Sequence, residues 1–363
     1  MKIHIDIGWW SAYTQLAVSY PSPHFYPAIF IKKEAHNHMK GKIALEEHFA
    51  IEATVEDALA YFPNAPFLPE LRNKVMDIQK IRLDMMDQSG IEVCVISLNA
   101  PAVQAIQSKE KAIEIAKLAN DTLAEECAIN PKRFAGFAAL PMQDPDAAAE
   151  ELNRCVKDFG FVGALVNGFS QVNIEDSSLY YDLPQYWDFW SEVERLNVPF
   201  YLHPRSPLLS QQKSYEGHPW LKAAAWGFSV ETGTHALRLI GSGLFDKYPG
   251  INIILGHLGE LLPVNIWRTS HRVQVDPRGC PAKLPFSDYL MNNFYITTSG
   301  NFRLSPVLAA MVEMGSDRIM FATDYPFEVI SEAAEWFDNM EIGEIERQKI
   351  GRLNAARIFH LDV

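Results

Sequence analysis

Cysteine is scarce in this sequence, and positive charge is nowhere concentrated. The 363 residues include only four cysteines, which lie far apart and form no C-x-x-C pair: Cys94, Cys127, Cys155 and Cys280. This spacing argues against a zinc knuckle and against a disulfide framework, and it favours a reducing, cytoplasmic location. Basic residues number 32 against 45 acidic ones, for a net charge of −13, and no long Lys/Arg run occurs. We therefore expect a small molecule as the partner, not a nucleic acid or an anionic membrane.

Long apolar runs and several common catalytic motifs are also missing. No run approaches the roughly 20 residues that a helix needs to cross a bilayer, so we expect no membrane span. The phosphate-binding pattern G-x-x-x-x-G-K-S/T, the dinucleotide pattern G-x-G-x-x-G and the hydrolase pattern G-x-S-x-G do not occur. The composition is that of a globular enzyme with a large core, because 48% of the residues are hydrophobic and 21% are charged.

Residues 1–38 differ from the rest of the chain. They carry aromatic residues and prolines with no helical or strand period, and they end in the cluster His36-Asn37-His38. Asp6 and a polar patch interrupt the segment, and it contains no arginine, which argues against a secretory signal and a transit peptide. The residues from Met39 onward resemble a natural protein start. We interpret 1–38 as a dispensable extension, with a docking arm as the alternative, and 39–363 as one folded domain.

Short apolar runs alternate with longer stretches of helical spacing from Lys42 onward, which is typical of a parallel α/β fold. The pattern predicts eight strands, over 42–45, 93–97, 134–138, 163–166, 199–203, 252–256, 294–298 and 319–323. Gly90 and Gly160 lie where intervening helices should end. Eight such units predict a (β/α)₈ TIM barrel, with C-terminal helices after Glu328 packed on it. The active site of such a barrel lies at the C-terminal ends of the strands.

Acidic and imidazole side chains fall at the ends of four predicted strands. The first strand ends in Glu46 and His48, which are two residues apart and so project to the same side of an extended chain. Three other strands end in His203, His257 and Asp324. Each of these alone is most often a satisfied polar residue, but together they point at one barrel mouth. Such a set suits one borderline divalent ion, Mn²⁺ or Zn²⁺, with positions open for substrate or water.

This set resembles the amidohydrolase superfamily, whose metal ligands are an H-x-H on strand one, histidines on strands five and six, and an aspartate on strand eight. Two departures favour a single metal: Glu46 replaces the first histidine, and strand four ends in Asn167 and Gly168, not in a metal-bridging lysine. Both departures are typical of the aminocarboxymuconate-semialdehyde-decarboxylase-like branch, whose members cleave C–C bonds. Within that branch, residues 44–49, 163–169, 200–205, 254–260, 297–302 and 323–328 closely resemble the γ-resorcylate (2,6-dihydroxybenzoate) decarboxylases.

The resemblance covers the chain from Met39 to its end and implies an activity. It implies reversible, non-oxidative decarboxylation of a hydroxybenzoate by a homo-oligomer, a dimer or tetramer, with one Mn²⁺ or Zn²⁺ and no organic cofactor. His48 favours 2,6-dihydroxybenzoate, because the related 2,3-dihydroxybenzoate and salicylate decarboxylases usually carry alanine there. By the same resemblance, the metal ligands are Glu46, His48, His203 and Asp324, and His257 and Glu260 lie beside the substrate.

Roles in catalysis and binding follow from these positions. We expect Asp324 to deliver a proton to the ring carbon that bears the carboxylate, while His257 relays a proton and Glu260 orients it. The expected substrate contacts are His203, Asn167, Tyr61 and Arg268. We expect Tyr61 to lie in a lid, formed by residues 51–69, that folds over the barrel mouth, and Arg268 to act on the site of a partner subunit. Arg205 is expected in a surface ion pair. Two alternatives remain open: a metal-dependent hydrolase such as a lactonase, and a binding protein that kept the barrel and lost the chemistry.

Overall fold

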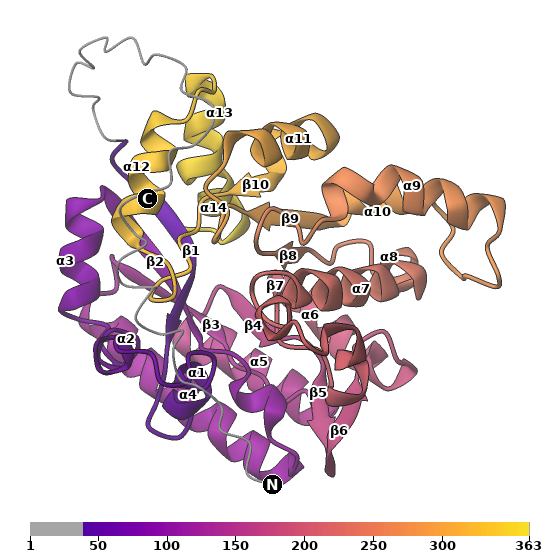
Figure 1. Ribbon diagram of the computed structural model, residues 1–363, viewed down its shortest axis with the longest axis horizontal. Coiled ribbons are helices and arrows are strands. Elements are labelled where there is room, and N and C mark those ends of the chain that lie inside the picture. Colours follow the sequence, from indigo (N-terminus) through magenta and orange to yellow (C-terminus); the bar gives the residue numbers. More distant parts are fainter. Residues whose placement is uncertain (1–38, 363) are drawn as a thin grey trace, which may run out of the picture. The chain divides into compact units, whose positions relative to one another are not determined.

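Eight parallel strands form the centre of the structure, a computed structural model that describes residues 39–362 (Figure 1). In sheet order they are β1 (Lys42–Phe49), β2 (Ile91–Leu98), β3 (Phe134–Ala138), β4 (Gly163–Asn167), β7 (Phe200–His203), β8 (Ile253–Leu255), β9 (Phe294–Thr297) and β10 (Ile319–Met320). An isolated parallel bridge between Leu45 and Ala322 joins the two edge strands of this sheet. Each strand overlaps its predicted range, so the predicted barrel is confirmed. The predicted N-terminal extension, with His36 and His38, lies outside the described residues.

Helices surround the strands and connect them. Their bounds are α1 (Val55–Leu59), α2 (Leu68–Met76), α3 (Ile81–Gln88), α4 (Lys109–Ile129), α5 (Pro145–Phe159), α6 (Trp187–Leu196), α7 (Gly227–Gly241), α8 (Leu244–Lys247), α9 (Leu262–Val275), α10 (Phe286–Asn293), α11 (Leu304–Met314), α12 (Ile330–Asn339), α13 (Glu344–Gln348) and α14 (Asn354–Ile358). Helix α5 shows how the sequence sets such bounds. The Asp144 side chain accepts a hydrogen bond from the Ala147 N–H at its start, and Gly160 ends it in the left-handed conformation (φ 69°).

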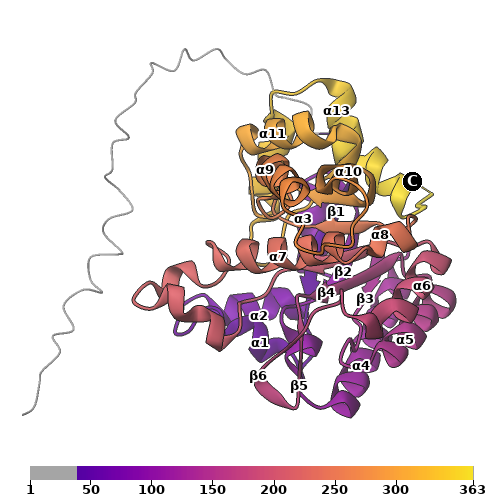
Figure 2. The ribbon, with the colours of Figure 1, turned by 90° about the vertical axis from the view of Figure 1, so that its right-hand side faces the viewer.

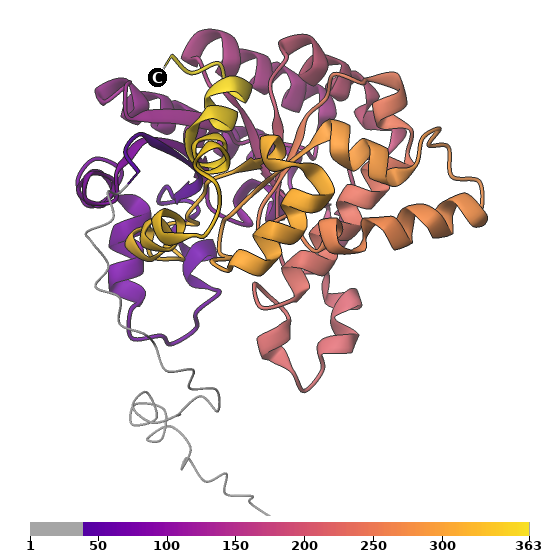
Figure 3. The same ribbon diagram turned by 90° about the horizontal axis from the view of Figure 1, so that it is seen from above.

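Alternation along the strands decides what fills the barrel. Ile43, Val93 and Tyr201 belong to the buried cluster inside it, whereas residues such as Ala44 and Cys94 pack outward in the layer under the helices. The C-terminal segment, yellow in Figure 3, contributes to the inner cluster. The ring of Phe359 packs at 5.5 Å from that of Phe137, so the C-terminal residues cover the N-terminal end of the barrel. The expected packing of the C-terminal helices on the barrel is therefore present.

Two excursions at the strand ends were not predicted. An antiparallel hairpin, β5 (Ser170–Val172) with β6 (Ile174–Leu179), follows β4. A long segment with 3₁₀ turns at Leu209–Tyr215 and Pro219–Leu221 follows β7 and projects from the body in Figure 2. Within residues 39–362, no helix has both the length and the apolar character that a membrane crossing requires.

A buried histidine on α7 makes stability depend on pH. His235 is fully buried between the rings of Tyr180 and Tyr181, each with its centroid 4.8 Å away, and its Nε2 accepts the Tyr181 backbone N–H at 3.2 Å. Burial, with a smaller effect from Arg238, lowers the pKa of His235 to about 3. The imidazole is therefore neutral in the folded protein and titrates near 6.5 when unfolded. Its contribution to stability is present above pH 6.5 and is lost as the pH falls toward 3.

We expect the free energy of unfolding to fall by about 2 kcal/mol between pH 7 and pH 5 on account of His235 alone. The His235→Gln variant keeps an acceptor for the Tyr181 N–H but does not titrate, so its stability should change less over this interval. Urea unfolding of both proteins at the two pH values measures the difference. An equal drop in the two proteins would show that His235 does not carry the effect.

Candidate active site

Side chains from β1, from β7 and from Asp324, four residues after β10, meet at the C-terminal end of the barrel. The β1 ladder shifts register between Ala44 and Glu47, and Glu46 has a positive φ of 60°. This irregularity lets Leu45 fill the barrel interior and still turns the next residue, Glu46, toward the same interior. His48 follows on the same side, as the spacing predicted. Asp324, two residues after the bridge from Ala322 to Leu45, also has a positive φ of 69°.

Four of the predicted residues form a group of suitable metal donors. One donor atom from each of Glu46, His48, His203 and Asp324 lies within 4.8 Å of all the others. His203 Nε2 is 3.3 Å from Glu46 Oε1, and His48 Nε2 is 3.4 Å from Asp324 Oδ1. Glu46 Oε1 and His48 Nε2 are buried and have no hydrogen-bond partner among residues 39–362. Unsatisfied oxygen and imidazole nitrogen atoms facing one point fit a divalent ion such as Mn²⁺ or Zn²⁺.

A left-handed turn after β8 places His257 and Glu260 beside this group. Residues 257–261 all have positive φ values, between 50° and 83°. Within this turn, His257 Nδ1 lies 2.7 Å from Glu260 Oε1, and Glu260 is buried. The other ring nitrogen, Nε2, lies 3.6 Å from Asp324 Oδ2 and 3.7 Å from Glu46 Oε1. An unfavourable backbone conformation over several residues is typical of a functional site, where the surrounding structure holds it in place.

The side chains shift one another's pKa values. Burial lowers the pKa of His48. Burial alone would also lower the pKa of His257, but Glu260 and Glu46 outweigh it and raise that pKa well above its usual value. Burial alone would raise the pKa values of Glu46 and Asp324, and the neighbouring imidazoles lower both instead. Glu260 and Glu46 therefore favour the protonated form of His257, which lies beside the Asp324 carboxylate.

A cavity of about 120 Å³ opens onto this group. Its lining combines three polar site residues with aromatic and small side chains: Tyr61, Phe62, Ala100, His203, Ala223, Ala224, Phe228, His257, Asp324 and Phe327. Tyr61 packs edge-on against Phe228, with centroids 5.7 Å apart, and Phe62 stacks on Phe327 at 6.2 Å. The predicted lid therefore does lie over the mouth, although it contains helix α1 and is not a bare loop. Its aromatic side chains Tyr61 and Phe62 form part of the cavity wall.

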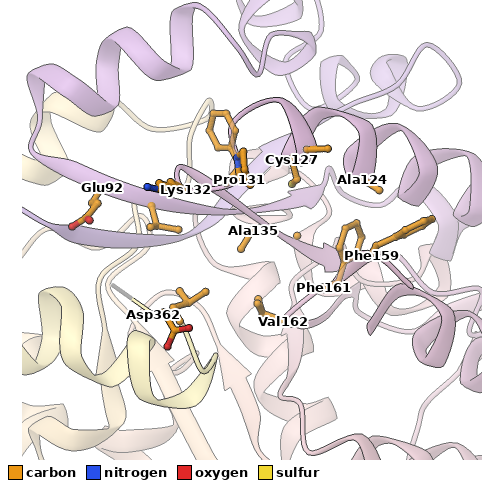
Figure 4. A pocket seen from close by; sticks show the side chains of 16 residues that line it. Glu92, Ala124, Cys127, Pro131, Lys132, Ala135, Phe159, Phe161, Val162 and Asp362 are labelled. Carbon is orange, nitrogen blue, oxygen red and sulfur yellow. The ribbon is translucent and has the colours of Figure 1, made fainter. Parts of the chain in front are cut away.

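A larger cavity lies elsewhere and lacks this chemistry. It has a volume of about 590 Å³ and is lined by residues at the N-terminal ends of β2, β3 and β4, such as Glu92 and Phe134, together with Cys127 and Lys132 (Figure 4). None of its 16 lining residues is a histidine. In barrel enzymes that end of the strands serves stability, not catalysis. The smaller cavity is therefore the candidate active site.

Three other residues singled out from the sequence do not line this cavity. Asn167 is buried and donates to the Asn99 carbonyl at 3.0 Å, and Arg268 is exposed on α9. The expected surface ion pair of Arg205 is wrong. Arg205 is 7% exposed, donates to the Phe169 carbonyl at 2.8 Å and stacks on the ring of Phe169. The guanidinium also donates to the Gln104 carbonyl and to the Gln171 side-chain oxygen, and no local sequence pattern predicts these acceptors.

Tyr201 and Thr297 are site residues that the sequence interpretation missed. The Tyr201 hydroxyl donates to Glu46 Oε2, and the Thr297 hydroxyl donates to the same oxygen at 3.2 Å. They leave Oε1 of Glu46 facing the other donors. A signal for Tyr201 was present, because it precedes His203 by two residues on a strand and so shares its face.

Gly256 leaves the space that the Glu46 carboxylate occupies. A Cβ at position 256 would lie 2.8 and 2.9 Å from the two carboxylate oxygens. We expect Gly256→Ala to displace Glu46 and to weaken Mn²⁺ binding about 10–100-fold, the usual cost of disturbing the surroundings of a metal ligand. Calorimetric titration of the metal-free variant with Mn²⁺ measures this. Gly241→Ala, whose Cβ would meet nothing closer than 3.4 Å, is the control, and equal affinities of the two variants would contradict the expectation.

A family model described as amidohydrolase matches residues 45–361. The chain belongs to the amidohydrolase family. It is 58% identical to the γ-resorcylate decarboxylase of Rhizobium sp. (strain MTP-10005) over 327 residues, which span 89% of this chain and 99% of that protein. It is also 58% identical to the γ-resorcylate decarboxylase of Rhodococcus jostii (strain RHA1) over 329 residues, 89% of this chain and 100% of that protein.

Solved structures agree with these sequence matches. A crystal structure of 2,6-dihydroxybenzoate decarboxylase complexed with 2,6-dihydroxybenzoate has a TM-score of 0.87 at 58% identity, covering 89% of this chain and 100% of that chain. The enzyme from Polaromonas sp. JS666, with bound manganese and the inhibitor 2-nitroresorcinol, has a TM-score of 0.87 at 56% identity, covering 90% and 98%. The resemblance found in the sequence is therefore confirmed. The chain is a member of the amidohydrolase family and is similar to γ-resorcylate decarboxylases over most of its length.

Proposed function

We propose that this chain catalyses the reversible, non-oxidative decarboxylation of 2,6-dihydroxybenzoate to resorcinol and CO₂. The observation that carries the proposal is the opening of the Glu46, His48, His203 and Asp324 group into a small cavity walled by aromatic rings. The similarity to decarboxylases named for this substrate, over nearly their whole length, supports it. A flat aromatic acid fits such a cavity, because the aromatic rings of Tyr61, Phe62, Phe228 and Phe327 are among its lining side chains.

The four donors would hold one divalent ion, and the manganese in a relative's structure favours Mn²⁺ over Zn²⁺ here. A bound Mn²⁺ would supply Lewis acidity and would orient the carboxylate and an adjacent phenolate oxygen of the substrate. Tyr201 and Thr297 keep Glu46 turned toward the cavity through Oε2. The Ser97 hydroxyl lies 3.2 Å from His48 Nδ1 and fixes the orientation of that ring.

Proton delivery is the task of Asp324 and His257. The ring carbon that bears the carboxylate must first accept a proton and become tetrahedral, after which the C–C bond breaks and its electrons restore the aromatic ring. Asp324 and His257 both line the cavity, and Asp324 Oδ2 lies 3.6 Å from His257 Nε2. Asp324 transfers to the ring carbon a proton that it receives from His257, and Glu260 holds His257 in position through Nδ1. One proton enters and one CO₂ leaves, so no oxidant or reductant is needed.

The test is product analysis with competing substrates. We expect anaerobic incubation with 2,6-dihydroxybenzoate to give resorcinol, separated by chromatography, at a kcat/KM well above that for 2,3-dihydroxybenzoate or salicylate. Preference for one of those two acids would move the assignment to that substrate. Absence of any decarboxylated product from a metal-loaded protein, with hydrolysis of a lactone, would replace the proposal with the hydrolase alternative.

We further propose a homo-oligomer, dimer or tetramer, in which Arg268 completes the cavity of a partner subunit. The substrate is an anion, yet no lysine or arginine is among the cavity-lining residues of the described chain. Arg268 lies on α9 next to Trp267, which is 70% exposed, and Val264, which is 69% exposed. Exposed apolar side chains on the helix that carries Arg268 favour packing of this face against another copy.

Arg268→Ala should raise the KM for 2,6-dihydroxybenzoate about tenfold or more, the usual cost of losing a charged contact to an anion, without changing the molar mass. Trp267→Asp should lower the molar mass measured by light scattering. Arg278→Ala, which removes an exposed arginine near the end of the same helix, is the control. If Arg268→Ala and Arg278→Ala have the same KM, Arg268 does not bind substrate.

Location and domain boundaries are proposals of the same kind. We propose a cytoplasmic location, because the four cysteines of the described chain are all free. We also propose that residues 39–363 form the catalytic domain and that 1–38 are dispensable for the reaction. Equal kcat and KM for the full chain and a protein that begins at Met39 are the expected result.

A further inference from the structure

The barrel has one weak seam, and the candidate ligands lie on both sides of it. Strand β1 pairs with β2 along nearly its whole length. On its other side β1 forms no continuous ladder with the short strand β10. It meets the segment after β10 through the isolated bridge from Leu45 to Ala322 and a few separate backbone hydrogen bonds, such as that from the Leu45 N–H to the Phe321 carbonyl at 3.2 Å. Glu46 and His48 follow this bridge on one side and Asp324 follows it on the other. A small displacement at the seam therefore changes the spacing between the ligands directly.

Glu47 ties the two sides together from behind the site. Its side chain points to the opposite face of β1 from His48 and is fully buried. Its Oε1 accepts the backbone N–H of Thr323 at 3.0 Å, and Oε2 accepts the hydroxyl of Thr323 at 2.7 Å. Because Thr323 immediately precedes Asp324, these bonds fix where Asp324 leaves the barrel.

Arg82 reaches the same place from the helix layer. Capping by Asp77, whose Oδ1 accepts the Ile81 N–H at 2.7 Å, holds the first turn of α3 in place. The fully buried side chain of Arg82 donates through Nη2 to the His48 carbonyl, and its Cζ lies 4.7 Å from the centre of the Tyr325 ring. The His48 N–H in turn donates to the Tyr325 carbonyl at 2.7 Å. Arg82 thus contacts both sides of the seam, next to one ligand on each side.

Stability alone does not account for Arg82. Among residues 39–362, its Nε and Nη1 have no hydrogen-bond partner, and no carboxylate oxygen forms an ion pair with it within 4.0 Å. A buried, incompletely satisfied guanidinium is costly, and replacing such a charge by an apolar side chain of similar size is often neutral or stabilising. A buried arginine that costs stability, yet contacts the His48 carbonyl on one ligand-bearing segment and the Tyr325 ring on the other, points to a role in the site.

We propose that Arg82 and Glu47 are positioning residues: they clamp the seam between β1 and β10 and so set the spacing of His48 and Asp324. The inference rests on the proposed metal-dependent function. Glu47 and Arg82 hold the backbone from outside the barrel. His48 and Asp324, whose backbone they hold, would bind the ion inside it. Removing the clamp should therefore reduce metal affinity more than it reduces the stability of the metal-free protein.

The test compares Arg82→Met with wild type in two measurements. The first is Mn²⁺ affinity, from the electron paramagnetic resonance signal of free Mn²⁺ during titration of the metal-free protein. The second is the thermal unfolding midpoint of the metal-free protein. We expect Arg82→Met to bind Mn²⁺ about 10–100-fold more weakly, as substitutions behind metal ligands usually do, with an unfolding midpoint equal to that of wild type or higher. Arg82→Lys keeps the charge and one donor, and it should recover part of the affinity.

Arg133→Met is the matched control. Arg133 also donates to backbone carbonyls beside a barrel strand, those of Glu92 at 2.8 Å and Ile91 at 3.1 Å, but at the far end of the barrel. It should bind Mn²⁺ as wild type does. Wild-type affinity in Arg82→Met, or equal weakening in Arg82→Met and Arg133→Met, would overturn the clamp. If Arg82→Met does not fold, the same criteria apply to Arg82→Lys. Failure of wild type itself to bind Mn²⁺ would instead contradict the proposed function.

Discussion

Replacing Asp324 by asparagine should reduce kcat for 2,6-dihydroxybenzoate by at least about a thousandfold, within the range that loss of a general acid costs. The amide introduced by Asp324→Asn cannot accept a proton from His257 and pass it to the ring carbon, although it keeps the size of the side chain. Asp324 lies 3.4 Å from His48 Nε2 and 3.6 Å from His257 Nε2, so it is the group that links the donor cluster to the proton source. Single-turnover kinetics with a saturating excess of Mn²⁺ measures the chemical step and separates it from weakened metal binding.

Glu328→Gln provides the control for this change. Glu328 is half-buried close to Asp324, and burial, with a smaller effect from Asp324, raises the pKa of its carboxyl group. It does not line the cavity, so the same change from carboxylate to amide should alter kcat only a few-fold. A metal-saturated Asp324→Asn protein that turns over near the wild-type rate would remove Asp324 from the role of acid.

Loss of the metal should follow from either Glu46→Gln or His203→Ala. Glu46→Gln keeps an acceptor for the Tyr201 and Thr297 hydroxyls but removes the negative charge that faces the other donors. His203→Ala removes an imidazole nitrogen 3.3 Å from Glu46 Oε1. We expect Mn²⁺ content after reloading and dialysis to fall from one ion per chain to near zero in both variants, and resorcinol formation to disappear with it. Elemental analysis by mass spectrometry measures the content.

Glu151→Gln tests whether any buried carboxylate would give the same result. Glu151 is buried on α5, where it accepts from Asn120 at 2.7 Å and pairs with Arg154, and it lies outside the candidate site. Its variant should keep one Mn²⁺ per chain even if it is less stable. Full metal occupancy in Glu46→Gln or His203→Ala would show that the residue concerned is not a ligand.

Much of the fold was predictable because buried parallel strands leave a strong sequence signal. Each predicted strand is present, and Gly90 and Gly160 end their helices as expected, because only a residue tolerant of positive φ fits there. The β5–β6 hairpin was missed, since both strands are short and mostly polar and carry no alternating apolar pattern. The lid was recognised by its length and its aromatic residues, but its short helix α1 was not.

The site was predictable where a side chain lies at the end of a strand. Strand ends converge in a barrel, so Glu46, His48, His203, His257 and Asp324 could be placed together without knowing any distance. Residues that act through tertiary contacts gave no such signal. Arg82 reaches the seam from a helix, and Arg205 donates to carbonyl oxygens of two separate segments, so each looks from the sequence like an ordinary surface arginine. The contribution of Arg268 depends on a second copy of the chain.

The central claim is that one metal ion, held by Glu46, His48, His203 and Asp324, makes decarboxylation possible. Anaerobic titration of the chelated, metal-free protein with Mn²⁺ tests it most directly, with the initial rate of resorcinol formation from 2,6-dihydroxybenzoate as the readout. The account predicts no product before metal is added and a rate that rises to a plateau at one Mn²⁺ per chain. Resorcinol formation by the metal-free protein, or a plateau reached only at two ions per chain, would contradict it.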